Sequence, residues 1–225
     1  MYNKENKLLF IHVPKTGGTI IKARMFSNKE HHHTIFSKFE ESMENIDRLF
    51  KFCCLRDPYD RHVSAFIQLL SKRKKRKFNE YDKPNPESFR RWMENVWYPH
   101  FSNKEIKSDD NFLKNWMSKE SVFGFGPNIY HNYFTNQSGD MGSIDFFLDF
   151  NYLRDSLEML KVEYYNKMGE NLTSRLNGIQ NNNKKLNNYK NFWDDYTVDL
   201  FKSLNQKDIL FYKKMNIGFK ARIKD

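Results

Sequence analysis

The chain has 225 residues, a formal net charge of +10, 39% hydrophobic residues and 16% aromatic residues. That many large apolar side chains exclude a disordered chain and suffice for a folded core. The only two cysteines, Cys53 and Cys54, are adjacent, which excludes a disulfide framework and a cysteine zinc site and indicates two small buried hydrophobes. The positive charge favours anionic partners without choosing among them.

No apolar run reaches the roughly 18 residues of a membrane-spanning helix. The start of the chain, residues 1–7, is polar, which argues against a secretory signal. We therefore expect one domain over residues 1–225 in the cytoplasm, unless an anchor has been removed. The oligomeric state stays open.

Along the chain, apolar runs alternate with helical patterns. Residues 8–13 predict a buried strand that ends at Pro14, and residues 19–26 predict a helix after it. Residues 35–49 have helical character, and residues 50–55 predict a second buried strand. The later predicted elements are helices over 59–71, 87–97 and 111–117, a strand over 144–150, and helices over 152–168, 194–204 and 208–215. This order predicts an α/β fold with a central parallel sheet flanked by helices.

Two stretches lack these patterns. Residues 72–86 begin with six basic residues, Lys72-Arg-Lys-Lys-Arg-Lys77, and predict an exposed loop or insertion; residues 178–188 predict a polar loop. The basic run is either a solvated loop, a site that captures a polyanionic acceptor, or a nucleic-acid or nuclear-import signal. Aromatic residues of the neighbouring predicted helices either pack in the core or line a sugar site; they are Phe89, Trp92, Trp97, Phe112 and Trp116.

The segment Pro14-Lys-Thr-Gly-Gly-Thr19 lies where the first predicted strand gives way to a helix. At such a junction, free backbone N–H groups and the positive end of the helix dipole form an anion site. Gly17 and Gly18 allow close approach of the backbone, Thr19 adds a hydroxyl and Lys15 adds a positive charge. The segment is a candidate phosphate site; the alternative is an ordinary glycine turn with a solvated lysine.

A second candidate anion site follows the second strand. Arg56 stands at its carboxyl end, where open α/β sheets bind ligands, and Ser64 lies about two turns into the next predicted helix. The alternative for Arg56 is an ion pair with Asp57 or Asp60 that caps the helix. Two anion sites at successive strand ends suit a ligand with two separated phosphates. A Walker loop does not fit, because Lys15 precedes the glycines and we expect no acidic residue to end a later strand as a magnesium ligand.

Both segments resemble one family. Phe10-Ile-His-Val-Pro-Lys-Thr-Gly-Gly-Thr19 is similar to the 5′-phosphosulfate loop of the sulfotransferases grouped with heparan sulfate 2-O-sulfotransferase and its shorter microbial relatives. Leu55-Arg-Asp-Pro-Tyr-Asp-Arg-His-Val-Ser-Ala65 is similar to the 3′-phosphate motif of that group. A weaker similarity covers residues 178–219, whereas residues 72–145 match no motif of the group.

The resemblance implies a P-loop-like sulfotransferase fold and transfer of a sulfuryl group from 3′-phosphoadenosine 5′-phosphosulfate (PAPS) to a hydroxyl or amine. The acceptor it suggests is a carbohydrate, such as an anionic polysaccharide or glycan; no nucleic acid and no metal ion are expected. It implies cofactor contacts from Lys15, Thr16, Gly17, Gly18 and Thr19 to the 5′-phosphosulfate, from Arg56 and Ser64 to the 3′-phosphate, and from Lys184 and Lys185 in a covering loop.

Sulfuryl transfer also needs a base for the acceptor proton. The candidates lie in the triplet His31-His-His33, which is otherwise a surface cluster or a fortuitous metal site. The resemblance favours His32, because short relatives carry His-x-Thr here, and keeps His33 as the second choice; Lys15 would neutralise the leaving oxygen. His12, inside the first strand, is expected to be packed. The competing functions are a polyanion-binding or nucleic-acid-binding protein without turnover and a nucleotide or small-molecule kinase.

Overall fold

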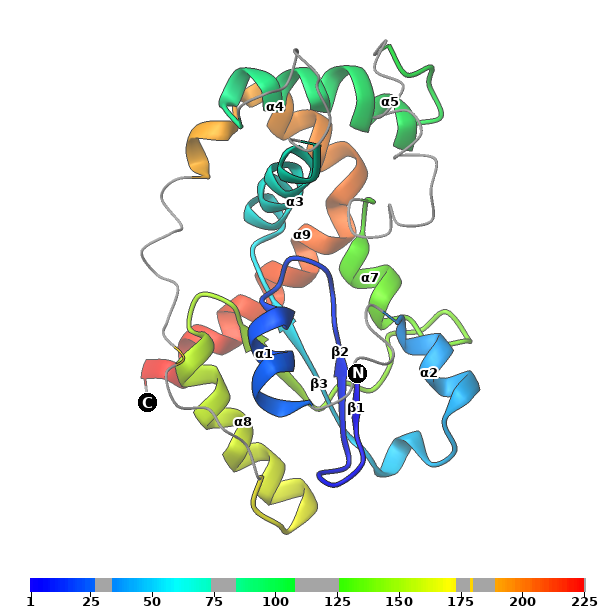
Figure 1. Ribbon diagram of the computed structural model, residues 1–225, viewed down its shortest axis with the longest axis vertical. Coiled ribbons are helices and arrows are strands. Elements are labelled where there is room, and N and C mark those ends of the chain that lie inside the picture. The colour runs from blue at the N-terminus through cyan, green and yellow to red at the C-terminus, as the bar shows by residue number, and fades with distance from the viewer. Residues whose placement is uncertain (27–33, 74–83, 108–125, 173–178, 180–188, 225) are drawn as a thin grey trace. The chain divides into compact units, whose positions relative to one another are not determined.

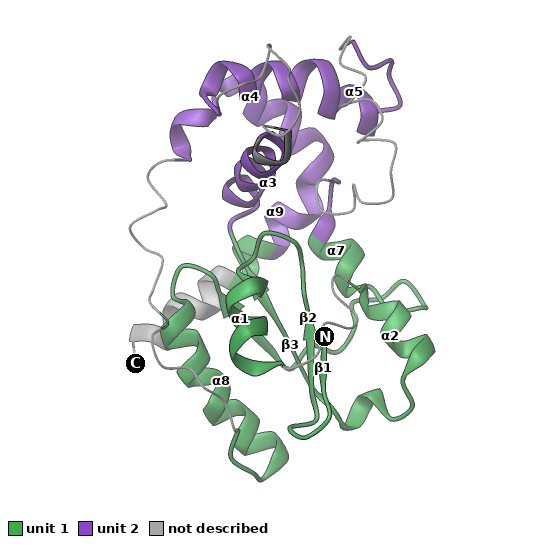
Figure 2. Cartoon of the chain, in the orientation of Figure 1, with its two compact units in different colours: residues 1–56, 130–183, 212–225 green, residues 57–129, 184–211 purple. Residues whose placement is uncertain are grey.

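The computed structural model describes residues 1–26, 34–73, 84–107, 126–172, 179 and 189–224. The chain divides into two compact units, each built from segments that are far apart in the sequence (Figure 2). Unit 1 contains residues 1–56, 130–183 and 212–225, and unit 2 contains residues 57–129 and 184–211. The single domain expected over the whole chain stays a prediction.

Unit 1 contains a mostly parallel four-stranded sheet (Figure 1). Its strands, in spatial as well as chain order, are β1 (Tyr2–Asn3), β2 (Leu8–Ile11), β3 (Phe50–Leu55) and β4 (Phe146–Asp149). β1 is antiparallel to β2, whereas β2, β3 and β4 are parallel to one another. The carboxyl ends of these three strands therefore meet at one edge of the sheet.

The three predicted strands are all present. β3 has the predicted bounds, while β2 ends at Ile11, two residues before the predicted end, and β4 is shorter than predicted at both ends. The sequence did not predict β1, whose two residues are polar and gain strand structure only by pairing with Leu8 and Leu9. The α/β fold with a central parallel sheet is confirmed.

Five helical segments belong wholly or mainly to unit 1. They are α1 (Gly18–Met25), α2 (Phe36–Ser42), the 3₁₀ helix η1 (Ile46–Arg48), α7 (Ile129–Phe134) and α8 (Leu153–Met168). α8 ends at Gly169, whose φ of 72° suits a glycine C-cap. Only α7 was not predicted. Within the described residues, no helix combines the length and the apolar character needed to cross a membrane.

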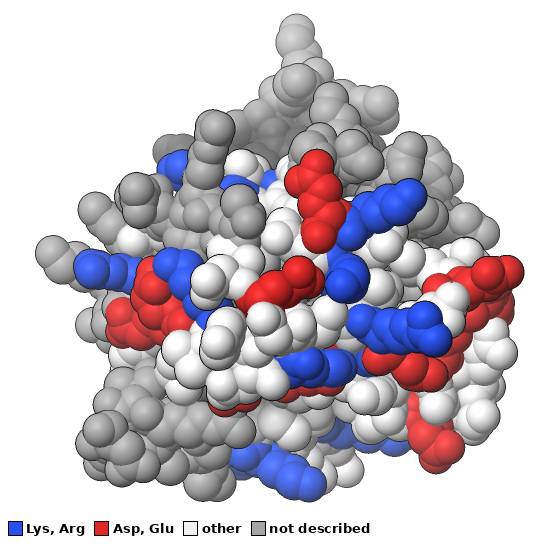
Figure 3. Space-filling model, turned by 90° about the horizontal axis from the view of Figure 1, so that it is seen from below, with Lys and Arg blue, Asp and Glu red and all other residues white. Residues whose placement is uncertain are grey.

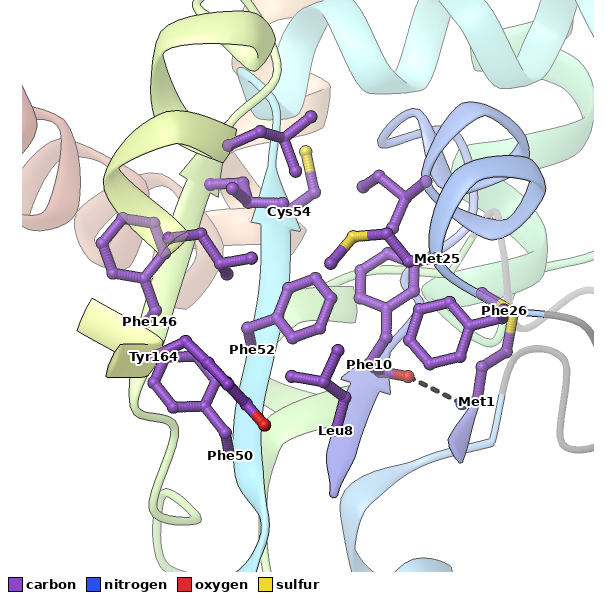
Figure 4. Packing of buried hydrophobic residues seen from close by; sticks show 14 of the residues in the cluster. Met1, Leu8, Phe10, Met25, Phe26, Phe50, Phe52, Cys54, Phe146 and Tyr164 are labelled. Carbon is purple, nitrogen blue, oxygen red and sulfur yellow. Dashed lines mark hydrogen bonds between the residues drawn. The ribbon is translucent and has the colours of Figure 1, made fainter. Parts of the chain in front are cut away.

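The core of unit 1 is rich in phenyl rings from the two central strands (Figure 4). The Phe10 and Phe52 rings stack with centroids 5.0 Å apart, and Phe50 meets Tyr164 of α8 edge-on at 5.5 Å. Cys53 and Cys54 are fully buried, and burial raises the pKa of both thiols well above the ordinary value. The interpretation of the cysteines as small buried hydrophobes is confirmed.

Charged side chains of both signs are interspersed on the face shown in Figure 3, so the described residues form no continuous basic surface there. Ion pairs in unit 1 have the same character: they join Lys7 to Glu170, Lys161 to Glu158 and Lys167 to Asp145. Part of the positive charge of these lysines is thus neutralised locally by neighbouring carboxylates.

Unit 2 is helical in its described residues. Its elements are α3 (Pro58–Arg73), α4 (Pro86–Trp92), the π-helix η2 (Met93–Trp97), α5 (Tyr98–Phe101), the 3₁₀ helix η5 (Lys190–Phe192) and the part of α9 (Asp195–Lys224) up to residue 211. Asp57 caps α3, since its Oδ1 accepts the N–H groups of Tyr59 at 2.9 Å and Asp60 at 3.2 Å. The helix predicted over 111–117 lies outside the described residues, as does the loop predicted over 178–188 apart from residue 179.

Two predicted boundaries can be compared with the structure. Lys72 and Arg73 continue α3 and Pro86 begins α4, so these three residues are not part of the loop predicted over 72–86. Residues 74–83 of that predicted loop lie outside the described residues. The helices predicted over 194–204 and 208–215 are both present as the two parts of α9, which meet at Asn205 with a non-helical φ of −116°. The side-chain amide of Asn205 donates to the carbonyl of Phe201 at 2.9 Å, so the break predicted from sequence is a kink.

The aromatic residues near the basic run form the core of unit 2. Phe89, Trp92 and Trp97 have no exposed side-chain surface and pack against α3 and Phe201. A sugar-binding wall needs exposed rings, so the alternative that these three residues line a sugar site is wrong. Phe112 and Trp116 lie outside the described residues.

A histidine lies at the centre of this aromatic core. His62 is fully buried, its Nε2 lies 3.1 Å from Met93 Sδ, and its ring centroid is 4.6 Å from that of Trp97 and 5.1 Å from that of Trp92. Burial lowers the pKa of His62 well below its ordinary value, and neighbouring Arg61 lowers it further. The folded protein therefore holds this imidazole neutral.

We predict that His62 makes the protein less stable in mild acid. As the pH falls below about 6.5, the unfolded chain binds a proton at His62 that the folded chain does not, so the free energy of unfolding decreases by up to about 1.4 kcal/mol per pH unit. His62→Leu should give a shallower decrease in urea unfolding between about pH 6.5 and about pH 5. Above about pH 7.5 the imidazole is neutral in the folded and the unfolded state. The difference in unfolding free energy between the two proteins in that range therefore reports only the change in packing. Equal slopes for the two proteins in acid would contradict the prediction.

Candidate active site

The loop between β2 and α1 has an unusual backbone. Lys15 has a φ of 71° and Gly17 a φ of 86°, so two residues of this short loop lie in the left-handed region. For a lysine this conformation costs about 1–2 kcal/mol. Thr16, between them, is fully buried, and its Oγ1 donates to the carbonyl of Val13 at 2.8 Å. The hydroxyl of Thr16 thus holds the turn together.

Neighbouring side chains leave no room for a side chain at either glycine of the loop. A Cβ on Gly18 would lie 1.8 Å from His12 Nε2, and a Cβ on Gly17 would lie 2.9 Å from Cδ2 of Phe150. The His12 ring is 3% exposed and stacks on Phe10 with centroids 5.4 Å apart, which confirms that His12 is packed. Both positions therefore require glycine, because the loop packs directly against the side chains of His12 and Phe150.

The amino-terminal end of α1 is suited to an anion. Gly17 is its N-cap and supplies no side-chain oxygen, and the first turn contains no acidic residue. The N–H groups of Ile20 and Ile21 both bond to the Gly17 carbonyl, at 3.0 and 3.3 Å. Thr19 is exposed in the first turn. The positive end of the helix dipole is thus not neutralised by the helix itself.

Arg56 lies against this loop at the end of the adjacent strand. Its Nη1 donates to the carbonyl of Lys15 at 3.1 Å, and its Cζ lies 4.5 Å from the centroid of the Phe150 ring. The residue is 7% exposed. The structure therefore brings together the Lys15 loop and Arg56, which sequence analysis placed at separate strand ends.

An acidic residue ends the strand β4. Asp149 is the last residue of β4 and is 6% exposed, and its Oδ1 accepts the N–H of Asn151 at 2.7 Å. The backbone N–H of Asp149 in turn bonds to Ser156 Oγ at 3.1 Å. This carboxylate shapes the turn into α8. Across the described residues, no group of three or more His, Cys, Asp or Glu is arranged to hold a metal ion.

Two further residues support Arg56. The hydroxyl of Tyr130, on α7, accepts the N–H of Arg56 at 2.9 Å and donates to the carbonyl of Arg56 at 2.5 Å. Phe150 follows β4 and contacts Arg56 through its ring. Sequence reasoning missed both residues, because Tyr130 is 74 residues away in the chain and neither belongs to a motif.

Comparison with known families now decides the class of protein. The sequence model of the sulfotransferase family matches residues 1–214. The chain belongs to the sulfotransferase family. The match confirms the resemblance seen at residues 10–19 and 55–65, and it makes the protein a sulfotransferase enzyme. Comparisons with curated proteins and with solved structures gave no match.

Several residues predicted for the sulfotransferase site cannot be placed together. His32, His33, Lys184 and Lys185 lie outside the described residues. Ser64 is half-buried on α3 in unit 2, whereas Arg56 belongs to unit 1, so their shared contact to one phosphate stays a prediction. The residues that the structure does bring together are those of the Lys15 loop, Arg56, Phe150 and Tyr130.

Proposed function

We propose that this sulfotransferase binds PAPS and transfers its sulfuryl group to a hydroxyl or amine of an acceptor, and that this acceptor is a carbohydrate. The residues we assign to PAPS are Lys15, Thr16, Gly17, Gly18 and Thr19 for the 5′-phosphosulfate, Arg56 and Ser64 for the 3′-phosphate, and Lys184 and Lys185 for a covering loop. The observation that carries the proposal is the bond from Arg56 Nη1 to the Lys15 carbonyl, at 3.1 Å, which joins two cationic residues at neighbouring strand ends.

The local chemistry fits a doubly phosphorylated nucleotide. Gly17 and Gly18 present backbone without side chains, and α1 begins there with neither a side-chain cap nor an acidic residue. Because Thr16 is buried and bonded to Val13, its contribution would come from the main chain, whereas Thr19 has an exposed side chain. These features favour an oxyanion at the loop.

When bound, PAPS supplies the sulfuryl group and leaves as adenosine 3′,5′-bisphosphate. The role we assign to the Lys15 ammonium is to neutralise the negative charge that develops on the departing phosphate oxygen. The first turn of α1 would hold the anion in line with the acceptor, since positioning contributes much of the rate enhancement in transfers of this kind. Arg56 would anchor the distant phosphate and so fix the register of the nucleotide.

We assign the general base to His32, with His33 as the second candidate. The support is the similarity of His32-His33-Thr34 to the His-x-Thr of short relatives. A histidine has an ordinary pKa near 6.5 and can accept the acceptor proton at neutral pH. His12 and His62 are poor alternatives, because they are 3% and 0% exposed.

A carbohydrate acceptor is supported by the likeness to the heparan sulfate group and by the net charge of +10. A basic protein attracts sulfated or carboxylated polymers. The basic run over residues 72–77 is the candidate for this attraction. Phe89, Trp92 and Trp97 are excluded from a sugar site by their burial, so the acceptor site must use other residues.

Calorimetric titration with nucleotides tests the proposal. We expect the protein to bind adenosine 3′,5′-bisphosphate at least about tenfold more tightly than adenosine 5′-monophosphate, because a charge-assisted contact to the 3′-phosphate is worth about 1.5–3 kcal/mol. ATP, which lacks a 3′-phosphate, should bind weakly. Equal affinity for the bisphosphate and the monophosphate, or tighter binding of ATP, would contradict the proposed function.

Lys15→Gly separates a catalytic lysine from a structural one. Glycine relieves the left-handed strain but gains freedom in the unfolded chain, so we expect the free energy of unfolding to change by no more than about 1 kcal/mol. Turnover of PAPS should fall by about 10²-fold or more. Lys7→Gly is the matched control, since Lys7 also has a positive φ, of 46°, and loses the same charge. If Lys15→Gly and Lys7→Gly retain similar turnover, Lys15 takes no part in the reaction.

His32→Ala should lower the turnover rate by roughly 10²–10⁴-fold, because a positioned base contributes about that much to proton transfer. Binding of adenosine 3′,5′-bisphosphate should stay unchanged, since the base contacts the acceptor. His33→Ala is measured beside it under the same conditions. A loss confined to His33→Ala would move the role to His33, and full activity in both variants would exclude the triplet.

A further inference from the structure

The peptide groups of Arg56 lie just beyond the last paired residues of the sheet. The register between β3 and β4 ends at Leu55 and Asp149, and the N–H of Phe150 bonds to the Leu55 carbonyl at 2.8 Å. At Arg56 the hydroxyl of Tyr130 serves both backbone groups: it accepts the N–H at 2.9 Å and donates to the carbonyl at 2.5 Å. A phenol has the donor and the acceptor that this double contact needs.

Tyr130 is itself held in place. Its side chain is fully buried, and its ring stacks on Phe134 with centroids 6.0 Å apart and planes 13° from parallel. The end of α7 is tied to the next turn, because the N–H of Gly142 bonds to the Phe134 carbonyl at 2.6 Å and Thr135 pairs with Met141. The hydroxyl therefore contacts Arg56 from a fixed position.

The main chain of Arg56 determines where its guanidinium lies. From this backbone the side chain reaches the Lys15 carbonyl, at 3.1 Å, and the face of the Phe150 ring, at 4.5 Å. These three residues and Tyr130 all belong to unit 1. A rotation of the Arg56 peptide would move the guanidinium away from both contacts, and so away from the loop assigned to the 5′-phosphosulfate.

We infer that Tyr130 is a positioning residue for the nucleotide: its hydroxyl fixes the backbone of Arg56 so that the guanidinium is held ready for the 3′-phosphate. Tyr130 acts through Arg56 and does not touch the nucleotide. The inference rests on the proposed function, in which Arg56 binds the 3′-phosphate. It implies that loss of the Tyr130 hydroxyl weakens binding only of nucleotides that carry this phosphate.

The test is Tyr130→Phe, with calorimetric titration of adenosine 3′,5′-bisphosphate and adenosine 5′-monophosphate. We expect the dissociation constant of the bisphosphate to rise about tenfold, as the loss of a well-aligned charged contact predicts, and that of the monophosphate to change by less than about twofold. The ratio of the two constants is the decisive quantity, because a general loss of stability changes both alike.

Tyr164→Phe is the matched control. Tyr164 is also fully buried in unit 1, and its hydroxyl donates to the carbonyl of Asn6 at 2.8 Å. Asn6 precedes the amino-terminal end of β2, whereas the Lys15 loop follows its carboxyl end. This variant loses the same atom and, like Tyr130→Phe, two polar contacts, since the hydroxyl also lies 3.1 Å from Oε1 of Glu170. We expect it to lower stability while leaving the ratio of the two dissociation constants at the wild-type value.

A second test is the double variant with Arg56→Ala. If Tyr130 acts through Arg56, Tyr130→Phe has no further effect on the ratio once the guanidinium is absent. Should Tyr130→Phe fail to fold, Phe134→Leu loosens the ring against which Tyr130 stacks and should shift the ratio in the same direction by a smaller factor.

The outcomes separate the two proposals. A wild-type ratio near one contradicts the proposed function and the inference together. If the wild-type protein prefers the bisphosphate as expected and Tyr130→Phe leaves the ratio of the two constants unchanged, the inference alone is contradicted. Equal weakening of both nucleotides, or an undiminished effect of Tyr130→Phe in the Arg56→Ala background, also overturns the role of Tyr130.

Discussion

The hydrogen bond from the Arg56 guanidinium to the Lys15 carbonyl joins the ends of two parallel strands, and the candidate site depends on it. Arg56 is 7% exposed, and a charged side chain that is buried to this extent needs several polar or aromatic contacts to offset its lost hydration. The Lys15 carbonyl at 3.1 Å and the Phe150 ring at 4.5 Å supply two of them. These contacts place two cationic residues at one edge of the sheet before any ligand arrives, which reduces the cost of ordering them on binding.

Close packing beneath the loop imposes a second constraint. Because His12 occupies the space beside Gly18 and Phe150 the space beside Gly17, the chain can pass there only as bare backbone. Lys15, in the same loop, lies in the left-handed region, at a φ of 71°. Strain of this kind persists where the surrounding structure maintains it, and it concentrates at functional sites. The loop is thus held in shape by its neighbours and by the bond from Thr16 to Val13.

Local patterns predicted much of the sheet and of the loop. β3 matches its predicted bounds because its six residues are all apolar or buried, and the loop was recognised because glycine and lysine at a strand–helix junction favour an anion. β1 and α7 were missed because neither has a strong pattern of its own; β1 has two polar residues that depend on pairing with β2. The aromatic residues at 89–97 allowed two interpretations, and only their burial decided for the core.

The sequence by itself determined the family, the parallel α/β arrangement and the two segments that carry the site, since these follow from short patterns of glycine, charge and apolar runs. Only the tertiary structure decided that Arg56 reaches the Lys15 carbonyl, that His12 requires glycine at position 18, and that Tyr130 holds Arg56. The reason is physical: a periodic pattern reports which face of an element is buried, whereas a contact between residues 41 or 74 positions apart depends on how the elements pack.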